Sequence, residues 1–257
     1  MFKKLIVLLF VAIFVCSCAP TYPKENLIEG IKELVLKETG RKCEVYKFDS
    51  TIYLDMEMDE LISTKNEVVN EAIKALQNAV FAITRVSLSS DAEIKIMVIS
   101  AFDPNYQVLL RMYQNIDDVK SYFYQRISRG DYEQRQLIEF EGPDTAKETI
   151  LNKHYISEEE YISRLIVSQI NMSARTNPFL SAAISALSLR YDKFDNGSIY
   201  ISSKMTDAAL VRKLLSKIIE EKLDEYIKKY KNFSLKSAII LLDNGNIAFE
   251  VTANKIS

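Results

Sequence analysis

The sequence predicts an α/β protein of the α+β kind, in which two β-α-β-β units form mixed sheets with long amphipathic helices packed on a face. Two observations carry this prediction. Segments rich in β-branched and aromatic residues alternate with longer segments whose apolar residues recur at helical spacing. In addition, the order strand, helix, strand pair occurs twice, from Ile52 to Val108 and from Ile199 to Phe249. Two such units imply helices packed on mixed sheets, and a mainly helical middle segment joins them.

The first possible half covers 25–112. Apolar residues from Leu27 to Val35 recur at helical spacing, and Gly40 follows as a C-cap. Thr64 and Glu67 have the spacing of a capping box, which predicts the start of a long helix. In chain order we expect a helix over 25–39, a strand over 44–58 with Ile52, Leu54, Met56 and Met58 on its buried face, a helix over 64–86, a strand over 93–101, a turn at 103–105 and a strand over 106–112.

The second possible half covers 192–257 and has the same order of elements. Thr206 is the expected cap of its long helix, and Asn244-Gly245 is a strong hairpin signal. Residue identity between the halves is low, so an internal duplication and two independent copies of a common motif both stay open. In chain order we expect a strand over 198–201, a helix over 207–230, a strand over 237–242, a turn at 243–246 and a strand over 247–252, with Ile52, Ile96, Ile199 and Ile239 all buried.

The middle segment, 113–191, is predicted to be a helical insert. Ser157 and Glu160 again have capping-box spacing, ahead of apolar residues at helical spacing. The run over 179–189 is apolar with many small residues, which suits core packing, a partner interface or a membrane-dipping helix. The expected helices lie over 117–127 and 129–140, after Pro143, and from Ser157 onward.

The N-terminal residues differ from the rest of the chain. Lys3 and Lys4 precede an unbroken apolar run from Leu5 to Val15, and Ser17 and Cys18 follow. As a helix this run would span about 16 Å, whereas a bilayer core is about 30 Å thick. A basic start, a short apolar run and a small residue before the cut are typical of an export signal.

This N-terminal stretch resembles the signal sequence and lipobox of a bacterial lipoprotein. Ser17 before Cys18 suits the peptidase, whereas Val15 before Cys16 does not. The resemblance implies a signal peptide over 1–17, diacylglycerol with a further acyl chain such as palmitate on Cys18, and a tether over 18–24. Two chains anchor a protein stably. A secretory signal cut near Ala19 and a short retained anchor are the alternatives.

The resemblance also implies a location. The globular domain over 25–257 would be held at a membrane of the cell envelope, on the periplasmic face of the outer membrane if the cell is Gram-negative. Its partner would be another envelope protein or a cell-wall component.

Composition excludes several function classes. The formal net charge is −2, so no basic excess speaks for nucleic acid. His154 is the single histidine and the six glycines are scattered, so neither a histidine-based metal or catalytic site nor a phosphate loop is expected. With Cys16 removed and Cys18 lipidated, Cys43 stands alone and no intramolecular disulfide can form in the mature chain. We expect no metal and no cofactor.

Arginine and tyrosine residues gather over 111–135, around the start of the middle segment. Both types combine apolar area with directional hydrogen bonds and are enriched at interface hot spots. Tyr124, Arg126, Arg129 and Tyr132 are therefore the candidate partner surface, unless ion pairs with nearby aspartates make the cluster structural. The sequence favours a non-catalytic binding or assembly module. The alternative is an envelope hydrolase with paired carboxylates such as Asp55 and Glu57.

Overall fold

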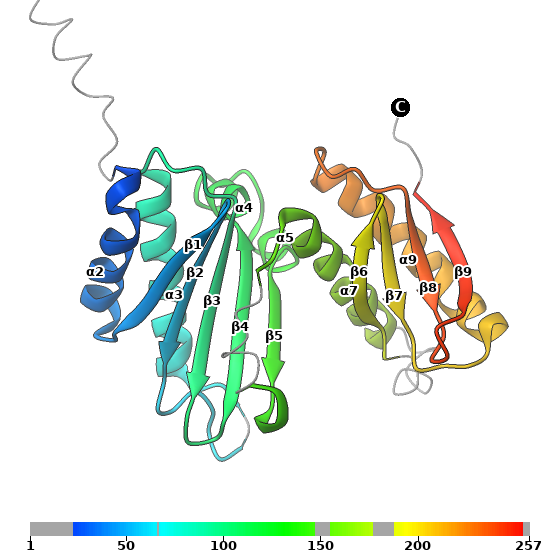
Figure 1. Cartoon of the computed structure of the whole chain (residues 1–257), viewed down its shortest axis with the longest axis horizontal. Coiled ribbons are helices and arrows are strands. Elements are labelled where there is room, and N and C mark those ends of the chain that lie inside the picture. The colour runs from blue at the N-terminus through cyan, green and yellow to red at the C-terminus, as the bar shows by residue number, and fades with distance from the viewer. Residues whose placement is uncertain (1–22, 66, 147–154, 177–187, 254–257) are drawn as a thin grey trace, which may run out of the picture. The chain divides into compact units, whose positions relative to one another are not determined.

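The computed structural model describes residues 23–65, 67–146, 155–176 and 188–253, which form two compact units (Figure 1). The first unit contains the described residues up to Phe123 together with 138–146. The second contains 124–137 and the described residues from Tyr155 onward. Cys18 and the rest of the signal sequence, His154 and most of the apolar run over 179–189 lie outside the described residues.

The first unit holds a five-stranded mixed sheet of order β1-β2-β3-β4-β5. Strands β2 and β3 are parallel neighbours joined through helix α3, whereas the β1/β2 and β3/β4 pairs are antiparallel. Helices α2 and α3 pack on each other, α2 against β1 and α3 against β3. The elements are η1 (Lys24–Asn26), α2 (Leu27–Thr39), β1 (Cys43–Phe48), β2 (Thr51–Glu57), α3 (Asn70–Leu88), β3 (Ile96–Asp103), β4 (Val108–Asn115), α4 (Ile116–Phe123) and β5 (Leu137–Glu141).

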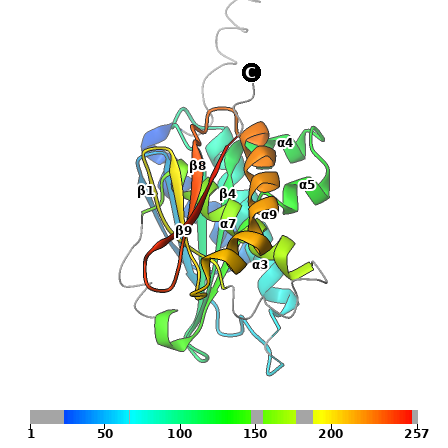
Figure 2. The same cartoon turned by 90° about the vertical axis from the view of Figure 1, so that its right-hand side faces the viewer.

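The second unit holds a four-stranded mixed sheet of order β6-β7-β8-β9. Strands β7 and β8 are parallel and joined through helix α9, and the outer pairs are antiparallel. Figures 1 and 2 show α9 running along β8 and β9, which it contacts, and α7 contacts α9 and β6. The elements are α5 (Arg129–Glu133), α7 (Glu158–Thr176), β6 (Arg190–Asp195), β7 (Ser198–Ser202), α9 (Ala208–Lys229), β8 (Ser237–Leu241) and β9 (Ile247–Thr252).

Both units share the order α-β-β-α-β-β, with the same strand directions, so the predicted fold class is confirmed and each repeat is longer than predicted. Backbone hydrogen bonds at matching places support this correspondence. The Met58 amide donates to the Phe102 carbonyl and the Ser203 amide to the Leu241 carbonyl, each over 2.8 Å. At the other end of the parallel pairs, the amides of Lys95 and Lys236 donate over 2.7 Å to the carbonyls of Ser50 and Gly197.

The cores follow from the apolar spacing. In α2, the buried residues Leu27, Ile31 and Val35 are four residues apart, and Gly40 ends the helix with φ +69°, a value that glycine adopts without strain. In α9, the buried residues Val211, Leu215, Ile219 and Leu223 repeat the same spacing. Burying each such side chain stabilises the fold by about 1.5–3 kcal/mol.

The expected strand over 44–58 is a hairpin, β1 and β2. Asp49 adopts φ +51° at the turn, a conformation that aspartate tolerates better than most residues. Because an aspartate rather than Asn-Gly makes this turn, the alternating pattern on both sides reads as one strand. The predicted buried face is confirmed, since Ile52, Leu54 and Met56 are all buried.

Helix α3 begins at Asn70, six positions after the predicted start at Thr64. The Ser63 hydroxyl accepts hydrogen bonds from the amides of Lys65 and Glu67, and an isolated bridge joins Ile62 to Val68. Serine side chains compete with helices by such local bonds, which holds this stretch in a loop. Helix α9 begins one residue later than predicted, because the side chain of Asp207 rather than that of Thr206 caps it.

Two strands fall where none was predicted. Only Arg129–Glu133 of the expected helix over 129–140 is helical, and β5 follows it at the edge of the first sheet. Strand β6 reads Arg-Tyr-Asp-Lys-Phe-Asp and has no buried residue, which removes the apolar signal of a strand. The other core predictions are confirmed for Ile52, Ile96 and Ile199, whereas Ile239 is half-buried. Within the described ranges, no helix is both long and apolar enough to cross a membrane.

Candidate functional site

The predicted Arg/Tyr cluster over 111–135 is divided between the two units. Its part over 124–135 lies in the second unit, around the single turn of helix α5. The Ser128 hydroxyl caps this helix by accepting the amide hydrogen of Asp131 over 3.1 Å. The Tyr132 amide donates to the Ser128 carbonyl and the Gln134 amide to the Gly130 carbonyl. A helix this short is not stable by itself, so other parts of the unit must hold it.

Helices α7 and α9 supply these anchors. The hydroxyl of the buried Tyr226 in α9 donates to the Gln134 carbonyl over 2.7 Å, and the Tyr161 hydroxyl in α7 donates to the Arg135 carbonyl. The Lys229 ammonium lies 3.1 Å from the Asp131 carboxylate. The three contacts fix the segment from both helices.

Arg135 belongs to this anchoring layer. Its guanidinium lies 2.9 Å from the Asp131 carboxylate and 6.0 Å from the centroid of the Tyr230 ring. Burial by itself would raise the pKa of Asp131, but hydrogen bonds from Arg135 and Lys229 outweigh it and hold the pKa below its ordinary value. Arg135, a member of the Arg/Tyr cluster, therefore has a structural role.

Three other members of the cluster, Tyr124, Arg126 and Arg129, are exposed to solvent. Tyr124 is 62 % exposed, and the Arg126 guanidinium lies over its ring, 5.5 Å from the centroid. Arg129 is paired with Glu133 over 2.7 Å, although its side chain is 81 % exposed. Tyr132 is half-buried. The structure therefore brings Tyr124 and Arg126 into contact, and we call Tyr124, Arg126, Arg129 and Tyr132 the displayed surface.

The carboxylates of the hydrolase alternative lie in the first unit. Asp55 and Glu57 share one face of β2, as the spacing predicts. Asp55 is hydrogen-bonded to Tyr46, and burial together with this carboxylate raises the pKa of the phenol. Glu57 is exposed at the end of its strand. Asp55 is thus committed to Tyr46, whose ring stacks on Tyr53 at 4.9 Å.

The same face of the first sheet holds a buried arginine. The Arg111 guanidinium contacts the Tyr113 hydroxyl at 3.4 Å and the Glu141 carboxylate at 4.0 Å, and Tyr113 donates to Glu139 over 3.0 Å. Burial disfavours the charge on Arg111, but Tyr113, Glu141 and Glu139 together raise its pKa. These contacts join β4 to the edge strand β5. Arg111 and Tyr113 belong to the predicted Arg/Tyr cluster, but their contacts were not predicted because strand β5 was not.

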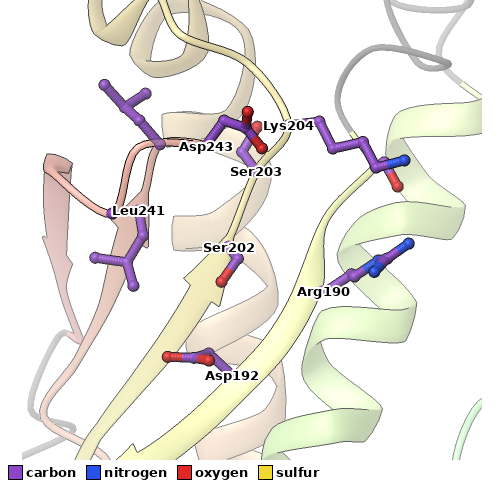
Figure 3. Close-up of a pocket in the computed structure, with 10 residues that line it drawn as sticks. Arg190, Asp192, Ser202, Ser203, Lys204, Leu241 and Asp243 are labelled. Atoms are coloured by element: carbon purple, nitrogen blue, oxygen red, sulfur yellow. The ribbon is translucent and has the colours of Figure 1, made fainter.

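A pocket of about 350 Å³ opens in the second unit at the carboxyl ends of β7 and β8 (Figure 3). Its charged side chains are Arg190, Asp192, Lys204 and Asp243. Sequence reasoning did not single out any of them, because they come from three separate segments and have no shared motif. Among the described residues, no group of three or more histidine, cysteine, aspartate or glutamate side chains could hold a metal ion.

Comparison with known proteins gave no match, whether to protein-family models, to curated proteins or to solved structures.

Proposed function

We propose that the protein is a lipid-anchored binding or assembly module of the cell envelope, which captures an envelope protein or cell-wall component through the displayed surface. The observation that carries this proposal is that segment 128–135 is fixed to α7 and α9, while Tyr124 and Arg126 beside it are exposed. A surface that is ordered before binding loses little conformational entropy when the partner arrives. Tyrosine and arginine are the residues that dominate binding energy at interfaces.

The anchor is tested by lipid labelling in bacteria. Cys18→Ala should abolish incorporation of labelled fatty acid and leave a precursor of higher mass, whereas Cys16→Ala should be processed normally. Cys16→Ala is a matched control, because it changes the same residue type two positions away. Equal labelling of the two variants would contradict lipidation at Cys18.

The displayed surface is tested by photo-crosslinking in cells. A crosslinker at position 124 should give one discrete adduct, and Arg126→Ala in the same chain should reduce it, because removing a hot-spot arginine costs about 1–3 kcal/mol of binding energy. A crosslinker at Lys217, an exposed position on α9, serves as the control site. If both sites give the same adducts, or if Arg126→Ala changes nothing, the displayed surface does not bind the partner.

An envelope hydrolase is the second candidate, and one observation favours it. The pocket in the second unit contains two carboxylates, Asp192 and Asp243. Figure 3 places Asp243 beside Ser203 and Asp192 beside Ser202, away from each other. Asp192 lies in β6 and Asp243 lies in the loop after β8, and the two carboxylates do not flank one position where a substrate bond could lie. For this reason we place the binding function first. A hydrolase should release soluble fragments from purified cell-wall material, and Asp192→Asn should abolish the release.

A further inference from the structure

The pocket of the second unit lies where parallel strands end. Strand β7 ends at Ser202 and β8 at Leu241, and the loops that follow supply Ser203, Lys204 and Asp243. In sheets of parallel strands, ligands commonly bind beyond the carboxyl ends of the strands, where the connecting loops diverge. The volume of about 350 Å³ is at the lower end of the range for small-molecule sites.

The neighbouring strand β6 completes the wall of the pocket. Arg190 pairs with Ser202 in the antiparallel ladder, and the register shifts between Tyr191 and Lys193, so that Asp192 is an extra residue in a bulge. Bulges are frequent beside functional sites, where they change the direction of a side chain. Both Arg190 and Asp192 line the pocket as a result.

Among the described residues, the pocket is lined by equal numbers of positive and negative side chains, which do not pair with one another. Two cations, Arg190 and Lys204, and two carboxylates, Asp192 and Asp243, line the same space. In the part of the chain that the structure describes, none of the four side chains takes part in an ion pair. Figure 3 shows Arg190 and Lys204 extending to the same side, while the two carboxylates lie elsewhere on the wall. A space lined by opposite charges that do not neutralise each other suits a ligand that carries both.

The first unit provides an internal comparison. At the corresponding place, the connection between β2 and α3 is longer, and Met58 and Leu61 in it are fully buried. The Asp103 carboxylate at the end of β3 is also fully buried and accepts amide hydrogens from Leu61 over 2.9 Å and Asn105 over 2.9 Å. In the first unit, the Asp103 carboxylate thus holds the loop over the carboxyl ends of β2 and β3. The shorter loop over 203–207 leaves the corresponding end of the second unit open.

We propose that this pocket binds a small zwitterion, an amino acid or the end of a short peptide, with its carboxylate between Arg190 and Lys204 and its ammonium group toward Asp192. A ligand with only negative charge would be repelled by the carboxylates, and a simple cation would be repelled by Arg190 and Lys204. Ser202 and Ser203 add hydroxyl groups that can bond either end of the ligand. The proposal does not depend on the displayed surface.

Titration followed by NMR tests this site in the chain from residue 19 onward. The probes are L-alanine, trialanine with free ends, trialanine with acetylated and amidated ends, and sodium acetate. Alanine or free trialanine should shift the amide signals of 202–204 and 241–245, while the blocked peptide and acetate should bind at least tenfold more weakly. Binding of alanine would indicate a free amino acid, and binding of trialanine alone would indicate a peptide end.

Substitutions assign the two halves of the pocket. Arg190→Gln and Lys204→Gln should each weaken binding of the zwitterion about tenfold or more, because each removes a charged hydrogen-bond donor. Asp192→Asn should weaken the zwitterion but not acetate. Lys213→Gln, an exposed position on α9, is the control with the same chemical change. Failure of both alanine and free trialanine to bind, or acetate binding as tightly as they do, would overturn the proposal.

Discussion

Removing one hydroxyl group should loosen the segment that carries the displayed surface. Tyr226 is fully buried in α9, and its hydroxyl donates to the Gln134 carbonyl over 2.7 Å. Tyr226→Phe keeps the ring and creates no cavity, so the change removes the bond to Gln134 without a loss of packing. A neutral hydrogen bond contributes about 0.5–1.5 kcal/mol net. Because Gln134 is exposed and water can replace the phenol at its carbonyl, we expect a loss of about 1 kcal/mol.

This loss should appear as faster local opening. A change of about 1 kcal/mol raises the open population of the segment about fivefold. The amide hydrogens of Tyr132 and Gln134 report on it directly, since they bond to carbonyls within the same turn. Hydrogen exchange measured by NMR should therefore speed up about fivefold at these two amides. The amides in the β8/β9 ladder of the same unit should change less, because they open only when the sheet does.

Tyr200→Phe provides the matched control. Tyr200 lies in β7, and its hydroxyl makes no hydrogen bond among the described residues. The two variants lose the same atom, so only Tyr226→Phe should affect Tyr132 and Gln134. If both variants exchange alike at these amides, the Tyr226 hydroxyl does not hold the segment, and the proposed preordering of the displayed surface is wrong.

Three further predictions concern the same units. The pKa of Asp131 is held below its ordinary value of about 4, so its ion pairs stabilise the segment above pH 4 and are lost as the pH falls through the lowered pKa. Hydrogen exchange of the Tyr132 amide should therefore speed up over that pH range, beyond its intrinsic pH dependence. In Asp131→Asn this additional pH dependence should disappear. Gly197 has φ +84°, and a Cβ there would lie 3.0 Å from the Lys236 side chain. Gly197→Ala should therefore lower the free energy of unfolding, measured in urea, by about 1–2 kcal/mol. Gly142 is the control: a Cβ there would meet no atom within 4 Å, so Gly142→Ala should change the free energy of unfolding by less than about 0.5 kcal/mol. Leu223→Ala should cost about 2–5 kcal/mol by thermal unfolding, while Leu210→Ala on the exposed side of the same helix should cost far less, and equal losses would contradict the assigned packing face of α9.

The sequence by itself was sufficient for the elements whose signals are local. Apolar spacing located α2, α3 and α9, because a helix that packs on one face needs an apolar residue at every third or fourth position. Gly40 and Asn244-Gly245 located a helix end and a hairpin, since few residues adopt positive φ without strain. The order of these elements was enough to predict the fold class.

Elements without such local signals required the tertiary structure. Strand β6 has no buried residue, and the β1/β2 turn uses Asp49 at positive φ, so neither periodicity nor a glycine marked them. Strand β5 is held to the sheet partly by Glu139 and Glu141, which meet Tyr113 and Arg111 more than twenty positions earlier in the chain. Contacts between residues so far apart in the sequence depend on which strands become neighbours, and a short stretch of sequence does not determine this.

The candidate sites divide in the same way. The residue types of the segment 111–135 marked it as a possible interface, because arginine and tyrosine are enriched at binding hot spots. Only the fold separated the cluster's members, since Arg135 is half-buried against Asp131 and Tyr230 while Tyr124 and Arg126 stay exposed. Arg190, Lys204 and Asp243 line one pocket because β6 and β8 are both neighbours of β7 in the sheet. A pairing of distant segments determines that arrangement, so the tertiary structure alone could decide it.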